Sequence, residues 1–409
     1  MMRSLFSGVS GLSNHQVKMD VIGNNIANVN TMGFKSSRAT FSEVFSQTLR
    51  GAGAPSDERG GTNAQQIGLG TGLSGTDTLH TQGSLQTTGN PTDLGIEGDG
   101  FFLLNQEDRL VYSRAGGFST DADGYLVNAA GLRVQGWRGE DGQLPETNTT
   151  NLDDLRIPMG ETVGAQATSR IVYANNLSAD ADPDETWSTP VEVFDSQGRE
   201  YTVNLSFSKA DSNTWNWELT TEDEALAITG DGSGAITFSD EGNVTDGETP
   251  DAVGVDVDGA SALALNLDFE AITQMSGSST VSAVERDGSP MGTLESFDVD
   301  ASGVITGVYS NGTVQTLGQV GIASFSNPSG MTKAGDNIFM ESNNSGLRQV
   351  GPPGTSGRGL MAPGSLEMSN VDLSEQFSEM IITQRGFQAN SRVVTTSDDM
   401  LSELVNLKR

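Results

Sequence analysis

Apolar residues recur at seven-residue intervals near both ends of the chain, and this repeat constrains the fold more than any other feature. The N-terminal repeat has two rows, three residues apart: Leu5, Leu12, Met19 and Ile26, and Gly8, His15, Ile22 and Val29. The C-terminal repeat is Leu366, Leu373, Met380, Phe387, Val394 and Leu401, with Phe377 and Val405 in a companion row. Spacings of three and four residues are typical of a coiled-coil seam. Because an isolated helix is marginal in water, we expect the two ends to pair within one chain and to pack against neighbouring chains. A purely intramolecular helical hairpin is the alternative.

Local signals set the expected limits of these helices. The first seam stops at the Asn- and Gly-containing run 28–33, whose residues tolerate the left-handed conformation that closes a helix. Pro363-Gly364 blocks a helix before the second seam, and Ser369 followed by Asp372 resembles a capping box. The second helix should therefore run from about residue 370 to about residue 407, with Leu366 just outside it.

The long middle of the chain has the pattern of β structure. Apolar and polar residues alternate with a period of two in several runs, which are 96–104, 124–127, 200–207, 214–219 and 303–306. Asp-Gly and Asn-Gly turns separate such runs, and the 51 glycines suit many tight turns. We therefore predict an α+β protein in which paired, coiled-coil-like terminal helices enclose nested antiparallel all-β domains.

Two Gly-, Ser- and Thr-rich stretches, 51–75 and 351–365, bracket the β region and indicate linkers. Their symmetry predicts that the chain passes outward, builds its β domains and returns. The predicted segments are 1–32 and 363–409 as the two parts of an inner helical domain, 33–75 as a connecting region, 76–150 and 291–362 as the two parts of a middle β domain, and 151–290 as an inserted outer β domain.

Charge and composition exclude several classes of protein. The net charge is −32, and most of it lies in residues 151–290, so nucleic-acid binding is not expected. The chain has no cysteine, which rules out disulfides and thiolate metal sites. No apolar run approaches the roughly 18 residues of a membrane span. Residues 1–11 lack the basic region and apolar core of a cleaved signal peptide, so we expect neither membrane insertion nor signal cleavage.

A search for chemical sites yields only structural interpretations. His15 lies on the helical seam and His80 in a Thr-rich stretch, so we expect a structural role for both and no zinc site. The run 121–125 resembles the start of a calcium loop, but Leu132 occupies the position of the expected glutamate, which favours a β-turn. The glycines of 68–72 lack the strand, helix and spacing of a dinucleotide loop.

One acidic cluster, formed by Asp180, Asp182, Asp184 and Glu185, is interpreted as a solvated loop rather than a cation site. No catalytic motif of the hydrolase or P-loop type is present. We therefore expect no catalytic residues, no metal, no cofactor and no enzymatic activity. A carbohydrate-active or adhesive β protein with helical tails is a competing interpretation, which would require a cleft with paired carboxylates or aromatic platforms. The four tryptophans, Trp137, Trp187, Trp215 and Trp217, are scattered along the sequence.

Several blocks resemble the signatures of the bacterial flagellar rod and hook family. They are 10–13, 19–20 and 24–35 near the N-terminus, 96–102 and 113–128 further on, and 364–373 and 384–390 near the C-terminus. The signature residues are Asn24, Asn25, Ala27, Asn28, Thr31, Gly33, Phe34, Gly98, Gly100, Phe101, Phe102, Gln384, Arg385, Gln388, Ala389 and Asn390. The blocks cover roughly the first 140 and last 50 residues and follow the order that the family shows.

Within that family, the insertion 151–290 resembles the outer domain of hook members, which favours a hook subunit over a distal rod subunit. The resemblance implies terminal helices that line a tube, disordered ends before assembly, and a flexible polymer that transmits torque as a universal joint. It implies export by the flagellar type III apparatus to an extracellular location in the hook and basal body. The implied partners are other copies of the chain, the distal rod protein, the hook cap and the hook–filament junction proteins.

Overall fold

The computed structural model describes residues 2–55, 60–107, 109–139, 142–145, 152–183, 185–221, 223, 225–247, 249–250 and 252–407. The chain divides into two compact units. The first unit comprises Met1–Ile157, Asp298–Thr306 and Thr316–Arg409, and the second comprises Pro158–Phe297 and Gly307–Gln315. Both ends of the chain belong to the first unit.

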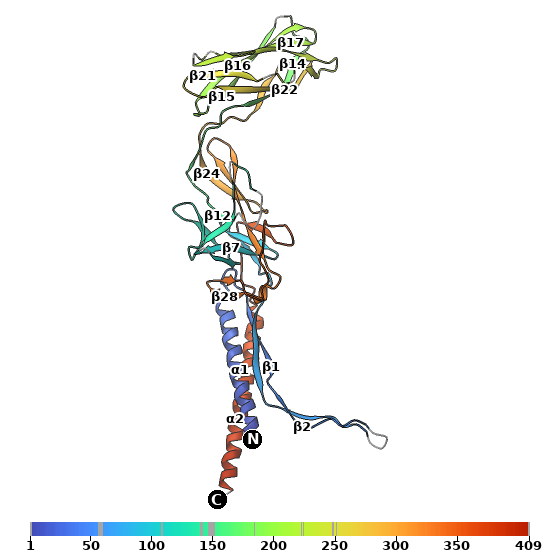
Figure 1. Ribbon diagram of the computed structural model, residues 1–409, viewed down its shortest axis with the longest axis vertical. Coiled ribbons are helices and arrows are strands. Elements are labelled where there is room, and N and C mark those ends of the chain that lie inside the picture. Colours follow the sequence, from blue (N-terminus) through green and yellow to red (C-terminus); the bar gives the residue numbers. More distant parts are fainter. Residues whose placement is uncertain are drawn as a thin grey trace. The chain divides into compact units, whose positions relative to one another are not determined.

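Two long helices form an antiparallel pair, α1 (Met2–Ala27) and α2 (Leu373–Asn406), drawn in blue and red in Figure 1. Ser4 Oγ lies 3.5 Å from Ser397 Oγ near one end of the pair, and Asn25 Nδ2 donates to Gln376 Oε1 at 3.0 Å near the other. The predicted helices are therefore present and paired.

The start of α2 differs in detail from the expectation. Asp372 is the N-cap, because its carboxylate accepts hydrogen bonds from the backbone N–H groups of Ser374 and Glu375. The predicted Ser369 cap is wrong, since Ser369 lies outside the helix. A carboxylate also suits this position because the N-terminal end of a helix carries partial positive charge.

The connecting region after α1 consists largely of paired strands. β1 (Ser37–Glu43) pairs with β4 (Thr71–Thr78), and β2 (Ser46–Arg50) pairs with β3 (Gln65–Gly68). The stretch 51–75, predicted as a linker, therefore contains β3 and the first part of β4. The stretch 351–365 also contains strands, because β31 pairs with β6 and β32 pairs with β5.

The β part of the first unit is built mainly on the strand order β26-β11-β7-β8-β29-β28. Its strands are β5 (Leu85–Thr87), β6 (Leu94–Glu97), β7 (Phe101–Gln106), β8 (Arg109–Ser113), β9 (Phe118–Thr120), β10 (Leu126–Asn128), β11 (Arg133–Arg138), β12 (Asp153–Asp154), β27 (Ile322–Ser324), β28 (Thr332–Gly335), β29 (Ile338–Met340), β30 (Gln349–Gly351), β31 (Leu360–Pro363) and β32 (Ser365–Glu367). A short 3-10 helix, Pro328–Gly330, precedes β28. The core of this unit includes Phe101, Tyr112, Phe325 and Phe339, whose rings meet edge to face.

The second unit is built around two five-stranded sheets with the orders β18-β21-β22-β14-β23 and β15-β16-β17-β19-β20. Its strands are β13 (Thr162–Val163), β14 (Arg170–Ser178), β15 (Thr186–Phe194), β16 (Glu200–Asp211), β17 (Thr214–Thr221), β18 (Leu226–Thr229), β19 (Ser233–Phe238), β20 (Val244–Asp246), β21 (Val253–Val257), β22 (Leu263–Met275) and β23 (Ser282–Arg286). Three further strands include residues of both units, namely β24 (Gly292–Val299), β25 (Val304–Tyr309) and β26 (Val314–Val320).

One ladder departs from the expected antiparallel pattern. β14 and β22 pair in parallel, whereas the other ladders of the two five-stranded sheets are antiparallel. Apolar side chains of both sheets meet in one core, where the Phe269 ring lies 5.6 Å from Tyr173, 5.9 Å from Phe207 and 5.7 Å from Trp217. The second unit therefore buries its own apolar residues.

A repeated turn joins several of the strands. A side-chain oxygen at its first position accepts hydrogen bonds from the N–H groups two and four residues later, and a glycine with φ between 76° and 82° stands at its fourth position. The first residues are Asp121, Asn128, Asp195, Ser239 and Asp300. Glycine suits this φ because it has no Cβ to clash. Asp121 thus opens a turn, as predicted.

Candidate functional site

Glycines at the contact between α1 and α2 allow the two helices to approach each other closely. A Cβ added to Gly386 would lie 2.6 Å from two ring atoms of His15, and one added to Gly8 would lie 3.0 Å from a methyl group of Val394. Real Cβ atoms do not approach other heavy atoms to 2.6 Å. The pair therefore depends on small residues at its crossing points, and His15 packs on Gly386 where the sequence placed it on the seam.

The buried residues of the pair are mostly small or polar. They are Gly8, Ile22 and Asn25 in α1, and Thr383 and Ser397 in α2. A helix face of this kind permits close approach but buries little apolar area. The intramolecular contact consequently leaves the large apolar side chains of both helices incompletely covered.

The predicted seam residues fall into three classes of burial. Ile22 is buried. The half-buried ones are Leu5, Leu12, Met19, Ile26, Val29, Met380, Phe387, Val394 and Leu401. The exposed ones are Leu373, Phe377 and Val405. Exposed apolar residues that the heptad prediction missed are Met2, Phe6, Val9, Ile381, Ile382, Val393, Met400, Leu404 and Leu407. These residues could have been predicted from the sequence by noting every large apolar residue of the two helices that lies outside the seven-residue repeat.

The head of the helix pair, where α1 ends and α2 begins, is tied to the β structure by buried polar groups. We call this region the joint and define it as residues 33–37, 79–84, 114, 333 and 367–370. Asn25, near the end of α1, is hydrogen-bonded to the first strand residue of the joint. The Asn25 side chain donates to Ser37 O at 2.8 Å and accepts from Ser37 N at 3.0 Å. Because Asn25 also donates to Gln376 of α2, one buried amide links both helices to β1.

Glu367 lies at the centre of the joint and binds two cations. Lys35 Nζ lies 2.7 Å from Glu367 Oε1, and Arg114 Nε lies 2.7 Å from Glu367 Oε2. The exposed fractions of the three side chains are 1% for Lys35, 4% for Arg114 and 0% for Glu367. The carboxylate also accepts from the N–H of Gly83 at 2.8 Å. Residues from three distant parts of the sequence are thus held by one carboxylate.

Burial sets the electrostatics of this triad. Desolvation lowers the pKa of Lys35 more strongly than the adjacent Glu367 raises it, and Arg114 lowers it further. Lys35 Nζ also donates to Thr81 O at 2.8 Å, and Arg114 donates to the carbonyls of Gly98 and Gly100 at 2.5 Å each. Removing one partner from a buried ion pair leaves an uncompensated charge. The triad therefore holds its segments together only while all three members are present.

Backbone contacts complete the joint. Gly33, with φ of 65°, donates its N–H to Glu367 O at 2.8 Å, and a Cβ there would lie 2.4 Å from Ala115 N. The Asn370 side chain accepts from Ser36 N and donates to Leu79 O, both at 2.8 Å. These contacts explain why a glycine and an asparagine occupy those positions.

His80 lies beside the joint against two aromatic rings. Its ring centroid is 5.5 Å from that of Phe101 and 5.3 Å from that of Phe339. Burial, followed by the positive charges of Lys35, Lys333 and Arg114, lowers the pKa of His80 to about 4. The imidazole is therefore neutral at physiological pH.

The signature residues separate into buried and exposed groups. Asn25, Gly33, Phe34, Gly100, Phe101 and Phe102 are buried. Asn28, Thr31, Gly98 and Asn390 are half-buried, and Asn24, Ala27, Gln384, Arg385, Gln388 and Ala389 are exposed. The sequence prediction did not select Lys35, Arg114, Glu367 or Asn370 as site residues, although all four lie within the quoted blocks. The signal was weak, because the same blocks contain further charged residues such as Asp121 and Asp372.

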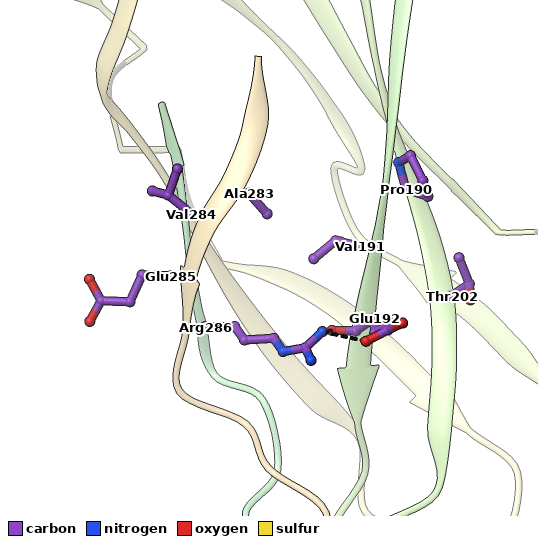
Figure 2. Close-up of a pocket in the computed structure, with 8 residues that line it drawn as sticks. All are labelled: Pro190, Val191, Glu192, Thr202, Ala283, Val284, Glu285 and Arg286. Carbon is purple, nitrogen blue, oxygen red and sulfur yellow. Dashed lines mark hydrogen bonds and ion pairs between the residues drawn. The ribbon is translucent and has the colours of Figure 1, made fainter. Parts of the chain in front are cut away.

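The second unit contains a separate cavity of about 560 Å³ between the edge strands β15 and β23. Arg286 of β23 reaches Glu192 of β15, where Nη1 donates to Oε2 at 2.9 Å (Figure 2). The cavity is lined by Pro190, Val191 and Val284 together with these two charged residues, and no aromatic residue lines it. The ion pair joins two of the three charged residues that line the cavity, and the third is Glu285.

Other expected or competing sites find no support in the described part of the chain. There, no group of three or more His, Asp or Glu side chains is arranged to hold a metal ion. Within the acidic cluster Asp180 accepts from Ser276 Oγ, whereas Asp184 lies outside the described residues. Trp137, Trp215 and Trp217 are buried and cannot form the aromatic platform of a carbohydrate-binding protein. None of the helices in the described residues is both long and apolar enough to cross a membrane.

Four family models match successive parts of the chain. They are the flagella basal body rod protein family over residues 5–35, the flagellar hook protein FlgE/F/G D1 domain over 95–172, the flagellar basal body protein FlaE D2 domain over 165–289, and the flagellar basal body rod FlgEFG protein C-terminal family over 362–407. The helix pair, the joint and the second unit all carry residues covered by these matches.

Similar proteins cover the whole chain. Flagellar hook protein FlgE of Treponema pallidum and that of Borreliella burgdorferi are each 43% identical, with 100% of both chains covered. Flagellar basal-body rod protein FlgG of Bacillus subtilis is 32% identical over 100% of both chains. The crystal structure of Helicobacter pylori flagellar hook protein FlgE2 shares the fold, with a TM-score of 0.52 and 16% identity over 69% of this chain and 100% of that one. Two hook proteins are 43% identical to this chain over its whole length, and the models of the hook-family domains match it as well. We conclude that this chain belongs to the flagellar hook protein family.

Proposed function

We propose that this chain, a structural subunit of the flagellar hook, polymerises through the apolar rows that its terminal helices leave exposed. The observation that carries the proposal is the mismatch between the two faces of each helix. Small and polar residues fill the contact within the pair, while Phe377 and Ile381 remain 50% and 52% exposed on α2. Burying one such side chain contributes about 1.5–3 kcal/mol, so several together stabilise contacts between copies.

The joint gives this assembly a mechanical connection to the β domains. A torque applied to the helix pair passes to the β sheet through Asn25 and through the Lys35–Glu367–Arg114 triad. Buried charge-assisted bonds are short and directional, and breaking one is expensive. We infer that the joint keeps the helix pair and the β structure of the first unit moving as one element.

The second unit is suited to the outer part of the tube. Most of its large apolar residues are buried in its own core, and the chain carries most of its net charge of −32 in residues 151–290. Contacts between polar, like-charged surfaces desolvate little, so such units can slide as the tube bends. We propose the division into an inner helical domain, a middle β domain and this outer domain, with the polymer acting as a universal joint.

The remaining proposals follow from membership of the family. The chain would be exported by the flagellar type III apparatus without signal cleavage and would act outside the cell without catalysis or a cofactor. Its partners would be further copies, the distal rod protein, the hook cap and the hook–filament junction proteins. A distal rod subunit is the weaker alternative, because the rod relative is 32% identical and the two hook relatives are 43% identical.

The test is to replace helix residues whose side chains remain about half exposed within one chain. We expect the double variant Phe377→Gln/Ile381→Gln to keep the circular dichroism and melting temperature of the wild-type monomer but to form no tubes. Pelleting and negative-stain electron microscopy measure the polymer. Val314→Gln is the matched control, because Val314 is 62% exposed in the second unit, and it should polymerise normally. Normal tubes from the double variant would refute the proposal.

A further inference from the structure

The paired strands β2 and β3, which we call the ribbon, form a two-stranded sheet with free edges. The ribbon is attached at its base, where Val44 N donates to Gly70 O at 3.1 Å and Asn14 of α1 donates to Thr71 Oγ1 at 2.8 Å. Beyond that point the residues of β3 and most of those of β2 are exposed. A two-stranded ribbon is marginally stable in water unless one face is covered.

One face of the ribbon carries two large apolar side chains beside Gln47, and the other face is polar. Gln47 lies opposite Ile67, so Ile67 shares a face with Phe45, which lies two residues before Gln47. The Ile67 and Phe45 side chains are 43% and 62% exposed, respectively. On the other face Gln66 Nε2 donates to Thr48 Oγ1 at 3.1 Å. The ribbon thus presents an apolar strip, and Arg50 stands at its end.

The C-terminal turns of α2 offer a complementary surface. α1 begins at Met2, and its Ser4 already lies beside Ser397, so the last turns of α2 extend past the N-terminus of α1. Met400, Leu404 and Leu407 recur there at intervals of four and three residues, which places them on one face. All three are exposed. Asp399 and Glu403 form an acidic row beside this face.

The geometry points to the ribbon of one copy packing on the free C-terminal end of α2 of a second copy. Apolar residues would cover apolar residues, and Arg50 would face Asp399 and Glu403. Each surface is uncovered within a single chain, and each carries the charge that the other lacks. This inference rests on the proposed polymerisation and assigns one specific contact within it.

The absence of cysteine from the sequence permits a direct test by cross-linking. Ile67→Cys and Leu404→Cys are prepared as separate full-length proteins, mixed, polymerised and treated with a short bismaleimide. We expect a cross-linked dimer in polymer and none in dilute monomer. Thr48→Cys mixed with Leu404→Cys is the matched control, because Thr48 lies on the polar face, and it should give at least tenfold less dimer.

The outcomes separate this inference from the proposed function. Polymer that forms with equal dimer yield from the Thr48→Cys and Ile67→Cys mixtures would overturn the contact while leaving polymerisation intact. A doubly substituted chain that cross-links within itself in dilute solution would also overturn it, because the ribbon would then lie on its own α2. Failure of the wild-type chain to polymerise would instead refute the proposed function. As a second measurement, Phe45→Ser should raise the critical concentration for polymerisation by about tenfold, since one lost apolar contact costs about that factor.

Discussion

The sandwich of the second unit and the terminal helix pair differ in how they satisfy their apolar residues. The sandwich buries a continuous core, in which Phe269 meets three other aromatic rings. The helix pair fully buries one large apolar residue, Ile22, beside glycine and small polar residues, and it leaves its other apolar seam residues half-buried or exposed. The sandwich is therefore stabilised by its own core, whereas the helix pair leaves apolar surface exposed that other copies of the chain can cover.

The joint combines features of both regions in its burial and in its type of interaction. Its central triad, Lys35, Arg114 and Glu367, is buried as the sandwich core is, but it is built from charges and hydrogen bonds rather than apolar contacts. Apolar cores tolerate substitution by relaxing partly, whereas a buried charge network fails when one member is lost. The contrast predicts how substitutions in each region should act.

The largest expected effect lies in the sandwich core. Phe269→Ala should lower the local free energy of opening of β16, β17 and β22 by about 4 kcal/mol, because a large cavity forms among the aromatic rings. Hydrogen exchange of the full chain measures this value. Amides of α1 and α2 should exchange as in the wild type. Faster exchange in both regions at once would show that the helix pair and the sandwich are not independent.

Glu367→Gln should destabilise the joint by about 3 kcal/mol, because Lys35 and Arg114 lose their shared counter-charge in a buried site. The amide of Gly83, which donates to Glu367, should exchange faster in a hydrogen-exchange experiment, and amides of the sandwich should not change. Unchanged exchange at Gly83 would contradict the role given to this carboxylate.

Gly386→Ala should cost about 2 kcal/mol in the helix pair, since the new Cβ would meet the His15 ring at 2.6 Å and force the helices apart. Polymer assembly should weaken as well, because the exposed rows would change their spacing. Hydrogen exchange of α1 and the yield of pelleted polymer check both points. Gly23→Ala serves as the control, because a Cβ at Gly23 meets nothing within 4 Å.

Stability of the joint should fall as the pH falls from 6.5 towards 4. The pKa of His80 is lowered to about 4 in the folded chain, so the unfolded chain binds a proton more readily throughout this window. Above pH 6.5 the contribution of His80 is constant. The pH dependence of Gly83 exchange should therefore be shallower in His80→Gln than in the wild type. If Gly83 exchange had the same pH dependence in both proteins, protonation of His80 would not be the cause of the loss of stability.

The smallest effect is expected at the surface ion pair of the cavity in Figure 2. Glu192→Gln should change the melting temperature little, because exposed ion pairs contribute only about 0–1 kcal/mol. The exposed fractions of the Arg286 and Glu192 side chains are 37% and 52%. This variant is matched to Glu367→Gln, since the same atom is replaced in both. Equal losses of stability would show that burial does not set the difference between the two pairs.

The sequence by itself determined the terminal helices, the β structure between them and the hairpin turns. These features depend on local rules: a seven-residue apolar repeat, alternation with a period of two, and a glycine three residues after a capping side chain such as Asp121. The N-terminal helix ends where the Asn- and Gly-containing run begins, as predicted. The predicted linkers contain paired strands, because strands elsewhere in the chain supply their hydrogen-bond partners. The Ser369 cap was wrong because Asp372 is the better-placed cap.

Only the tertiary structure decided which face of each helix is covered and which charges meet. A heptad shows that a face is apolar but not what it contacts, and here glycines and small polar residues form the close contact within the pair. Lys35, Arg114 and Glu367 lie far apart in the sequence, and chain folding alone brings them to within hydrogen-bonding distance. The parallel pairing of β14 with β22 is likewise a long-range choice, because the alternation within a strand carries no information about its partner's direction.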